Sequence, residues 1–136
     1  MRAMDVLVTL SLALVACGAS LQQPARAPQP PNAFVIVPYP PPAARVETLP
    51  RPPNPAAVWV DGQWSWGGAG WSWTPGAWVE PPPGGRFAAW ALELDGQLRF
   101  APASWRDASG RELGPPRALV TAVGQESGQG DAPRCP

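Results

Sequence analysis

Large apolar residues alternate with small or polar ones along residues 58–123, a period of two that favours short strands over helices. The pattern Trp-x-x-Gly-x-Trp occurs twice in this region, with a period of 14 residues. In a degenerate third copy, Phe replaces the first Trp and Ala replaces the Gly. The copies span residues 59–64, 73–78 and 100–105. Such repeats predict an all-β module, built as a small antiparallel meander of short Trp-rich hairpins.

Turn-forming residues separate the apolar segments. Asp61-Gly62 and Asp95-Gly96 are strong two-residue hairpin signals, and Pro75-Gly76 offers a loop of the same length. The four residues from Gly67 to Gly70 are expected to join two hairpins. A further turn is predicted at residues 107–110. Residues 117–123 then predict a last short strand.

The turns predict which aromatic residues lie opposite each other. Trp59 is expected to face Trp64, and Trp73 to face Trp78, across the two-residue turns. The glycine loop then places Trp64 opposite Trp73 and Trp66 opposite Trp71, and the turn after Phe100 places it opposite Trp105. Since side chains alternate between the faces of a strand, six indoles are expected on one face of the sheet, opposite a face of small or polar residues. They are Trp59, Trp64, Trp66, Trp71, Trp73 and Trp78.

These tryptophans admit two interpretations. They can form the core of a module that is too small to hold together without large aromatic side chains. Alternatively, they form an exposed platform on which sugar rings of peptidoglycan or another polysaccharide stack. A third hypothesis is a scaffold that assembles through strand edges or through Cys135.

Residues 17–57 are rich in proline, which disfavours helices and central strands and favours extended segments. We expect a disordered tether there, with residues 33–37 as a short edge strand that docks on the module. Residues 124–136 are polar and glycine-rich and are expected to be a disordered tail. Cys135 in this tail is expected to be a free thiol or to pair between two chains.

Residues 1–16 have the character of a secretory signal. Arg2 precedes an apolar run of 11 residues from Val6 to Ala16, which is shorter than the roughly 20 residues of a membrane span. The run ends in Leu14-Val15-Ala16-Cys17, which resembles the lipobox of bacterial lipoproteins. The resemblance implies cleavage before Cys17, lipidation of its thiol and attachment to a membrane. An ordinary signal peptide cut near Ser20 is the alternative.

The Trp repeats resemble the YXWGXW, or WxxGxW, repeats of small bacterial lipoproteins, which are also Pro-rich after the signal. The resemblance implies a location in the cell envelope. Since Gly18 rather than Asp follows Cys17, it also implies the outer membrane, on its periplasmic side or surface, rather than the inner membrane. It implies no particular biochemical activity.

Composition narrows the chemistry further. Ten Arg balance ten Asp and Glu, so the chain has no electrostatic preference for nucleic acid. The chain contains no His and no Lys, which excludes Ser-His-Asp and Cys-His catalysis and His-ligated metal sites. The carboxylates are scattered or lie in turns. We therefore predict that the protein is not an enzyme and uses no metal or cofactor.

Overall fold

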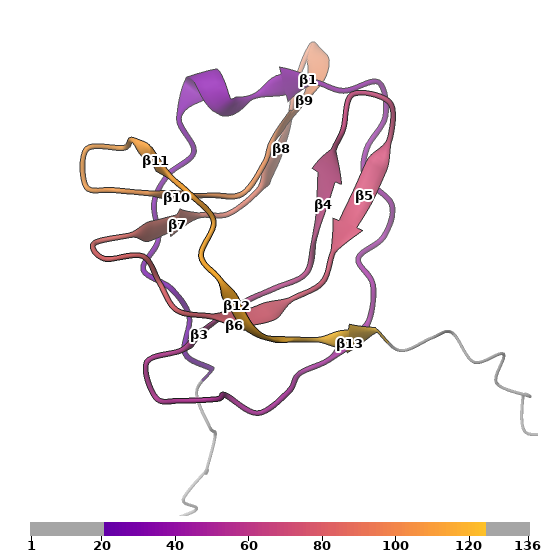
Figure 1. The fold of residues 1–136 in the computed structure, drawn as a ribbon. Helices are drawn as coiled ribbons and strands as arrows, with labels where there is room; N and C mark the ends of the chain where they lie inside the picture. The colour runs from indigo at the N-terminus through magenta and orange to yellow at the C-terminus, as the bar shows by residue number, and fades with distance from the viewer. Residues whose placement is uncertain (1–20, 125–136) are drawn as a thin grey trace, which may run out of the picture.

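The computed structural model describes residues 21–124, and these form an all-β fold of small antiparallel sheets, as predicted (Figure 1). The signal peptide, Cys17, Cys135 and residues 125–136 lie outside the described residues. A single turn of 3-10 helix, η1, spans Pro31–Ala33. The strands are β1 (Val35–Ile36), β2 (Glu47–Thr48), β3 (Val58–Val60), β4 (Gln63–Trp66), β5 (Trp71–Thr74), β6 (Ala77–Val79), β7 (Arg86–Ala88), β8 (Ala91–Asp95), β9 (Gln97–Ala101), β10 (Ser104–Arg106), β11 (Glu112–Leu113), β12 (Ala118–Thr121) and β13 (Val123–Gly124).

Residues 58–79 form one long bent hairpin, which we call hairpin A. β4 pairs with β5 around the glycine loop, where Gly67 N donates to Gly70 O at 3.0 Å, and β3 pairs with β6 further along. The register is the same in both ladders, because the bend between them takes up two residues on each strand, 61–62 on one and 75–76 on the other. The predicted pairs Trp64–Trp73 and Trp66–Trp71 are confirmed.

The predicted two-residue turns of hairpin A are wrong. Asp61-Gly62 and Pro75-Gly76 lie opposite each other at the bend and close no hairpin. Trp59 therefore pairs with Trp78, and neither residue pairs within its own repeat. One long hairpin brings the two repeats together, whereas separate short hairpins would keep each repeat apart.

Residues 86–106 form a second bent hairpin, hairpin B, on the same plan. β8 pairs with β9 around a turn at Gly96, close to the predicted position, but the register differs by one residue from that of a two-residue Asp95-Gly96 turn, because Leu94 lies opposite Leu98 rather than Gln97. β7 pairs with β10 in the same register beyond a bend. The expected contact of Phe100 with Trp105 across a turn is wrong. Phe100 lies opposite Leu92, and Trp105 lies opposite Phe87.

Shorter strands complete the sheets around the two hairpins (Figure 1). β12 pairs with β6, and β11 pairs with β10. The turn at residues 107–110 is present, with Gly110 N donating to Asp107 O at 3.0 Å. Gly124 belongs to β13, which pairs with β2, so the predicted tail does not begin at this residue.

The core lies where the two hairpins meet. Val58, Ala77 and Val79 on β3 and β6 are buried against Phe87 and Trp105 on β7 and β10. These small apolar side chains lie on the face of hairpin A opposite the tryptophans. That face of β3 and β6 is therefore buried inside the molecule. Its small side chains leave room for the aromatic rings of hairpin B.

The tether prediction is wrong for residues 21–57, which pack along both hairpins. Trp59 N donates to Gln22 O at 2.8 Å, and Phe87 N donates to Ala25 O at 2.7 Å. The expected edge strand at residues 33–37 is present as β1, which pairs with β9. Proline does not prevent this packing, because an extended segment at an edge needs few backbone N–H donors.

Candidate functional site

The six predicted tryptophans form three cross-strand pairs, which we call the Trp row. The ring centroids are 5.5 Å apart in Trp59–Trp78, 5.2 Å in Trp64–Trp73 and 5.2 Å in Trp66–Trp71. All three pairs are edge-to-face, with interplanar angles of 61–66°. Edge-to-face pairs of this kind add roughly 0.5–1.5 kcal/mol each beyond the area they bury.

Residues 39–50, which we call the strap, lie along the Trp row. The indole N–H of Trp64 donates to Ala43 O at 3.2 Å, that of Trp73 to Glu47 Oε1 at 3.0 Å, and that of Trp78 to Pro50 O at 2.7 Å. Tyr39 packs edge-on against Trp66, with ring centroids 5.5 Å apart. The Arg45 guanidinium lies 5.3 Å from the Trp64 ring centroid, within cation–π range.

The Trp row is buried unevenly along its length. Trp59 and Trp78 retain only 6% and 3% of their surface and contact Ala57 and Ala122. The other four are half-buried. Every ring meets an edge or a face of its partner, and the strap accepts from three of the six indole N–H groups. The indole N–H of Trp59 donates to Asp61 at 2.7 Å, and that of Trp71 is buried without a partner within the described residues. The residues predicted as a binding face are therefore built into the packing of the module.

The glycines of the repeats have a specific steric role at the bend. A Cβ on Gly62 would overlap Cζ2 of Trp73, and a Cβ on Gly76 would lie 2.6 Å from Cζ2 of Trp59. Each repeat thus supplies a glycine for an indole of the other repeat. Glu47 of the strap accepts from Gly76 N at 2.9 Å and so joins the bend to the Trp row.

The bend of hairpin B is bridged in a similar way by Gln29. Its Nε2 donates to Ala89 O at 2.7 Å and to Pro102 O at 2.8 Å, one acceptor on each strand. The Pro-rich segment thus supplies one polar side chain to each bend. Sequence reasoning missed both residues, because a lone Glu or Gln among prolines carries no local signal of a long-range partner.

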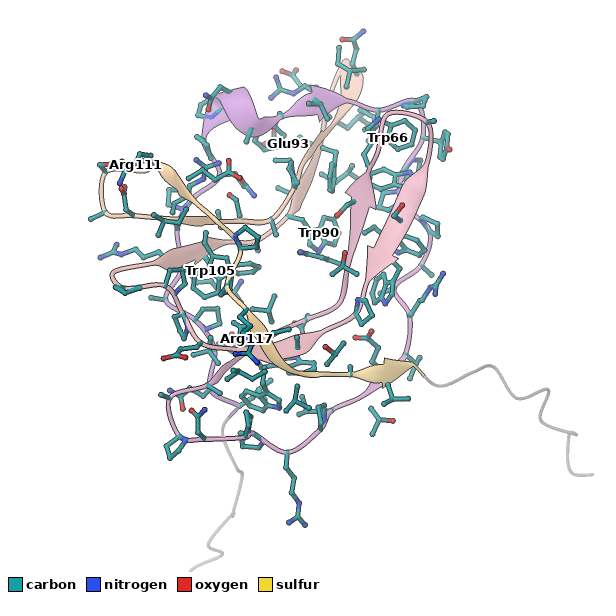
Figure 2. The ribbon with its side chains drawn as sticks, in the orientation of Figure 1. Trp66, Trp90, Glu93, Trp105, Arg111 and Arg117 are labelled. Carbon is teal, nitrogen blue, oxygen red and sulfur yellow. The ribbon has the colours of Figure 1, made fainter. Side chains whose placement is uncertain are left out.

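Between the hairpins lies a pocket of about 530 Å³, the interhairpin pocket. Its apolar lining includes Val60, Phe87 and Trp105, and Figure 2 shows Trp105 between the strands of hairpin B and the interior. Its polar lining consists of Asp61, Gln63, Thr74, Ser104, Glu112 and Thr121. The Ser104 hydroxyl is buried and has no hydrogen-bond partner within the described structure. An apolar lining with a few polar groups is typical of small-molecule sites.

Trp90 is a further aromatic residue that the sequence predictions did not include. It lies between the two hairpins in Figure 2 and keeps 43% of its surface exposed. Hairpin B shows the signal that was missed, since Phe87, Trp90 and Leu92 have the spacing of the repeat, with Trp in place of Gly. This fourth, degenerate copy becomes visible once the two hairpins are compared.

The carboxylates of the described residues are dispersed. Asp107 has a lowered pKa, chiefly because the Ser109 hydroxyl donates to it at 2.6 Å, and it orders the turn at residues 107–110. Glu93 is exposed and pairs with Arg99 at 2.9 Å. Among residues 21–124, no three Asp, Glu or Cys side chains are grouped as a metal site. No helix in the same range is long and apolar enough to cross a membrane.

Comparisons with protein-family models, with curated proteins and with solved structures find no match for this chain.

Proposed function

We propose that this chain is a lipid-anchored protein of the bacterial cell envelope with a non-catalytic role, in which the Trp repeat holds a binding module together. The structural part of the proposal rests on the Trp row, where six indoles pair with one another and three of them bond to the strap. Anchoring rests on the lipobox resemblance at Leu14–Cys17.

Intact mass of the membrane-extracted protein tests the anchor. Cleavage before Cys17 with attached acyl chains gives a mass above that of residues 17–136 alone. Cys17→Ser is the matched variant and is expected to lose both the acyl mass and the membrane association. A mass that corresponds to a cut near Ser20, without acyl chains, would contradict the proposal.

The membrane of residence is tested by one residue next to the anchor. In a Gram-negative host, the wild-type chain is expected in the outer-membrane fraction after density separation. Gly18→Asp is expected to move it to the inner-membrane fraction. Equal distribution of both proteins would contradict the outer-membrane part of the proposal.

A second candidate function is saccharide binding in the interhairpin pocket rather than on the Trp row. The pocket combines aromatic walls, which suit the apolar face of a sugar ring, with hydroxyl, amide and carboxylate groups that suit its hydroxyls. The observation that favours the pocket is the unpartnered Ser104 hydroxyl at its wall, beside the aromatic side chains of Phe87 and Trp105. The Trp row also holds an unpartnered polar atom, Nε1 of Trp71. The Trp row is the weaker candidate, because the strap lies along it.

Titration with soluble peptidoglycan fragments separates the two surfaces. Gln63→Ala and Ser104→Ala are expected to weaken binding several-fold if the pocket is the site. Gln97→Ala, which changes an exposed residue outside the pocket, is the matched control. If Trp66→Phe weakens binding and the pocket variants do not, the saccharide binds on the Trp row instead. Absence of binding by the wild-type protein would remove this candidate function.

A further inference from the structure

The chain is fixed to the module almost from its first described residue. Gln22 O accepts from Trp59 N at 2.8 Å, and the backbone of Arg26 forms an isolated parallel β-bridge with Phe87 of β7. Ala27 N also donates to Phe87 O at 3.0 Å. The proline content predicts a free tether of some forty residues before the Trp repeats. The structure instead holds the chain against the module from Gln22 onward.

This attachment limits the distance between the module and a lipid on Cys17. Five peptide units separate Cys17 from Gln22, and a fully extended chain spans at most about 3.3–3.6 Å per residue. Gln22 can therefore lie no more than about 18 Å from the Cys17 backbone. A bilayer that holds the acyl chains of Cys17 must lie close to this side of the module.

The same side carries exposed apolar residues. Leu21, Leu49 and Trp90 keep 38%, 48% and 43% of their surface exposed, and all three line one open hollow. Trp59 and Trp73 line the same hollow. Large apolar side chains gathered at one place on a surface commonly mark a contact with a partner or a membrane.

The chemistry of this hollow fits the interfacial region of a bilayer. Tryptophan is enriched there because its ring is apolar while its N–H is polar. Arg45 also lines the hollow, and Arg26 lines an adjoining hollow that Trp90 shares. The carboxylates of Glu47 and Asp61 line the first hollow as well, but both accept hydrogen bonds from the module itself. Neither guanidinium forms an ion pair within residues 21–124, so both charges are available to phospholipid phosphates.

We propose that the face formed by Leu21, Leu49 and Trp90 docks on the surface of the bilayer that holds the anchor. This inference rests on the proposed acylation of Cys17. The module then lies on the membrane, with Trp90 at headgroup depth. The β8–β9 turn points away, since Figure 1 places it at the end of the molecule opposite the point where the chain enters. The interhairpin pocket is not part of the docked face.

Spin labelling of the full lipidated chain tests the docking. Leu49→Cys and Leu94→Cys are each made in a Cys135→Ser background, labelled with a nitroxide, and reconstituted in phosphatidylcholine–phosphatidylglycerol vesicles. Leu94 is the matched control, being 82% exposed near the β8–β9 turn. Both labels are measured at a protein-to-lipid ratio low enough to keep the chains apart, because Leu94 also lies on an outer strand of its sheet. We expect the label at position 49 to be several-fold less accessible to a water-soluble relaxation agent in the vesicles than in detergent-free buffer without vesicles. The accessibility of the label at position 94 is expected to be the same in both. Adding Trp90→Ser is expected to restore much of the accessibility at position 49.

The outcomes separate this inference from the proposed function. If intact mass finds acyl chains on Cys17 but position 49 stays as accessible as position 94, the docking is overturned and the anchor stands. If Cys17 carries no acyl chain, the anchor and the docking are both overturned. If protection at position 49 occurs equally in the Trp90→Ser variant, the proposed role of Trp90 is overturned.

Discussion

Gly62 of the first repeat lies directly beneath the indole of Trp73 in the second repeat, so close that a methyl group on Gly62 would overlap the ring. The reciprocal contact joins Gly76 to Trp59. Each Trp-x-x-Gly-x-Trp repeat thus supplies one of the two strands that form the bend. Two copies must meet, each with its glycine under the other's tryptophan, before the bend is complete.

This relationship predicts the effect of a single methyl group. Gly76→Ala places a Cβ 2.6 Å from the Trp59 ring and 2.9 Å from Gly62 N, where neither the indole nor the backbone can move freely. Overpacking of this kind is expected to lower the free energy of unfolding by about 1–3 kcal/mol. Gly70→Ala is the control, because nothing lies within 4 Å of its added Cβ. Urea denaturation measures both, and equal stabilities would contradict the steric explanation.

The strap depends on Glu47, whose two oxygens accept from Trp73 Nε1 and Gly76 N. Glu47→Ala leaves both part-buried donors without a partner, and we expect a loss of about 1–3 kcal/mol in unfolding free energy. A double-mutant cycle with Trp73→Phe, which removes one donor, should show coupling between the two sites. The exposed Glu80→Ala is the control, and a matching effect there would argue against the strap contact.

The hydrogen bonds to the Asp107 carboxylate predict that the stability of the fold depends on pH. Its pKa lies below the ordinary value of 3.8, because Ser109 and Arg111 donate hydrogen bonds to the ionised form. A lowered pKa in the folded state adds stability above the unfolded pKa, and this stability is lost as the pH falls through the folded value. Ser109→Ala is expected to raise the Asp107 pKa toward 3.8, as measured by NMR titration. An unchanged pKa would show that the Ser109 hydroxyl is not the main cause.

Self-association is expected at the edge of the sheet β1–β9–β8. β8 is an outer strand of that sheet, and Leu94 on it is 82% exposed. Unpaired strand edges with apolar side chains favour association between chains. Leu94→Lys is therefore expected to lower the apparent mass in light scattering at high concentration. A dimer that disappears only with reductant or with Cys135→Ser would instead assign the contact to that thiol.

Part of the fold could be predicted because it depends on local sequence. The glycine loop at residues 67–70 and the turn at Asp95-Gly96 close hairpins where the sequence places them. The length of the glycine loop fixes the register beside it, which is why the pairs Trp64–Trp73 and Trp66–Trp71 are predicted correctly. At Asp95-Gly96 the turn is in the right place but the register is shifted by one residue, with Leu94 opposite Leu98. Asp61-Gly62 has the same local signal as Asp95-Gly96, yet it forms a bend because pairing continues past it to Trp78.

The covered state of the Trp row could not be predicted in this way. It depends on hydrogen bonds between residues more than twenty positions apart, such as Trp64 with Ala43 and Trp78 with Pro50. Proline content indicates an extended chain but does not indicate whether that chain is free or packed. Trp90 could not be recognised for a related reason. Residues 87–92 keep the spacing of the Trp-x-x-Gly-x-Trp repeat but none of its three residue types.

The sequence by itself determined that this chain forms short antiparallel strands, and which tryptophans share a face, because alternation and turn chemistry act over a few residues. Only the tertiary structure decided that the two repeats meet at one bend and that the Pro-rich segment lies along the indoles. Those contacts join distant parts of the chain, and their free energy depends on how all of the surfaces pack together.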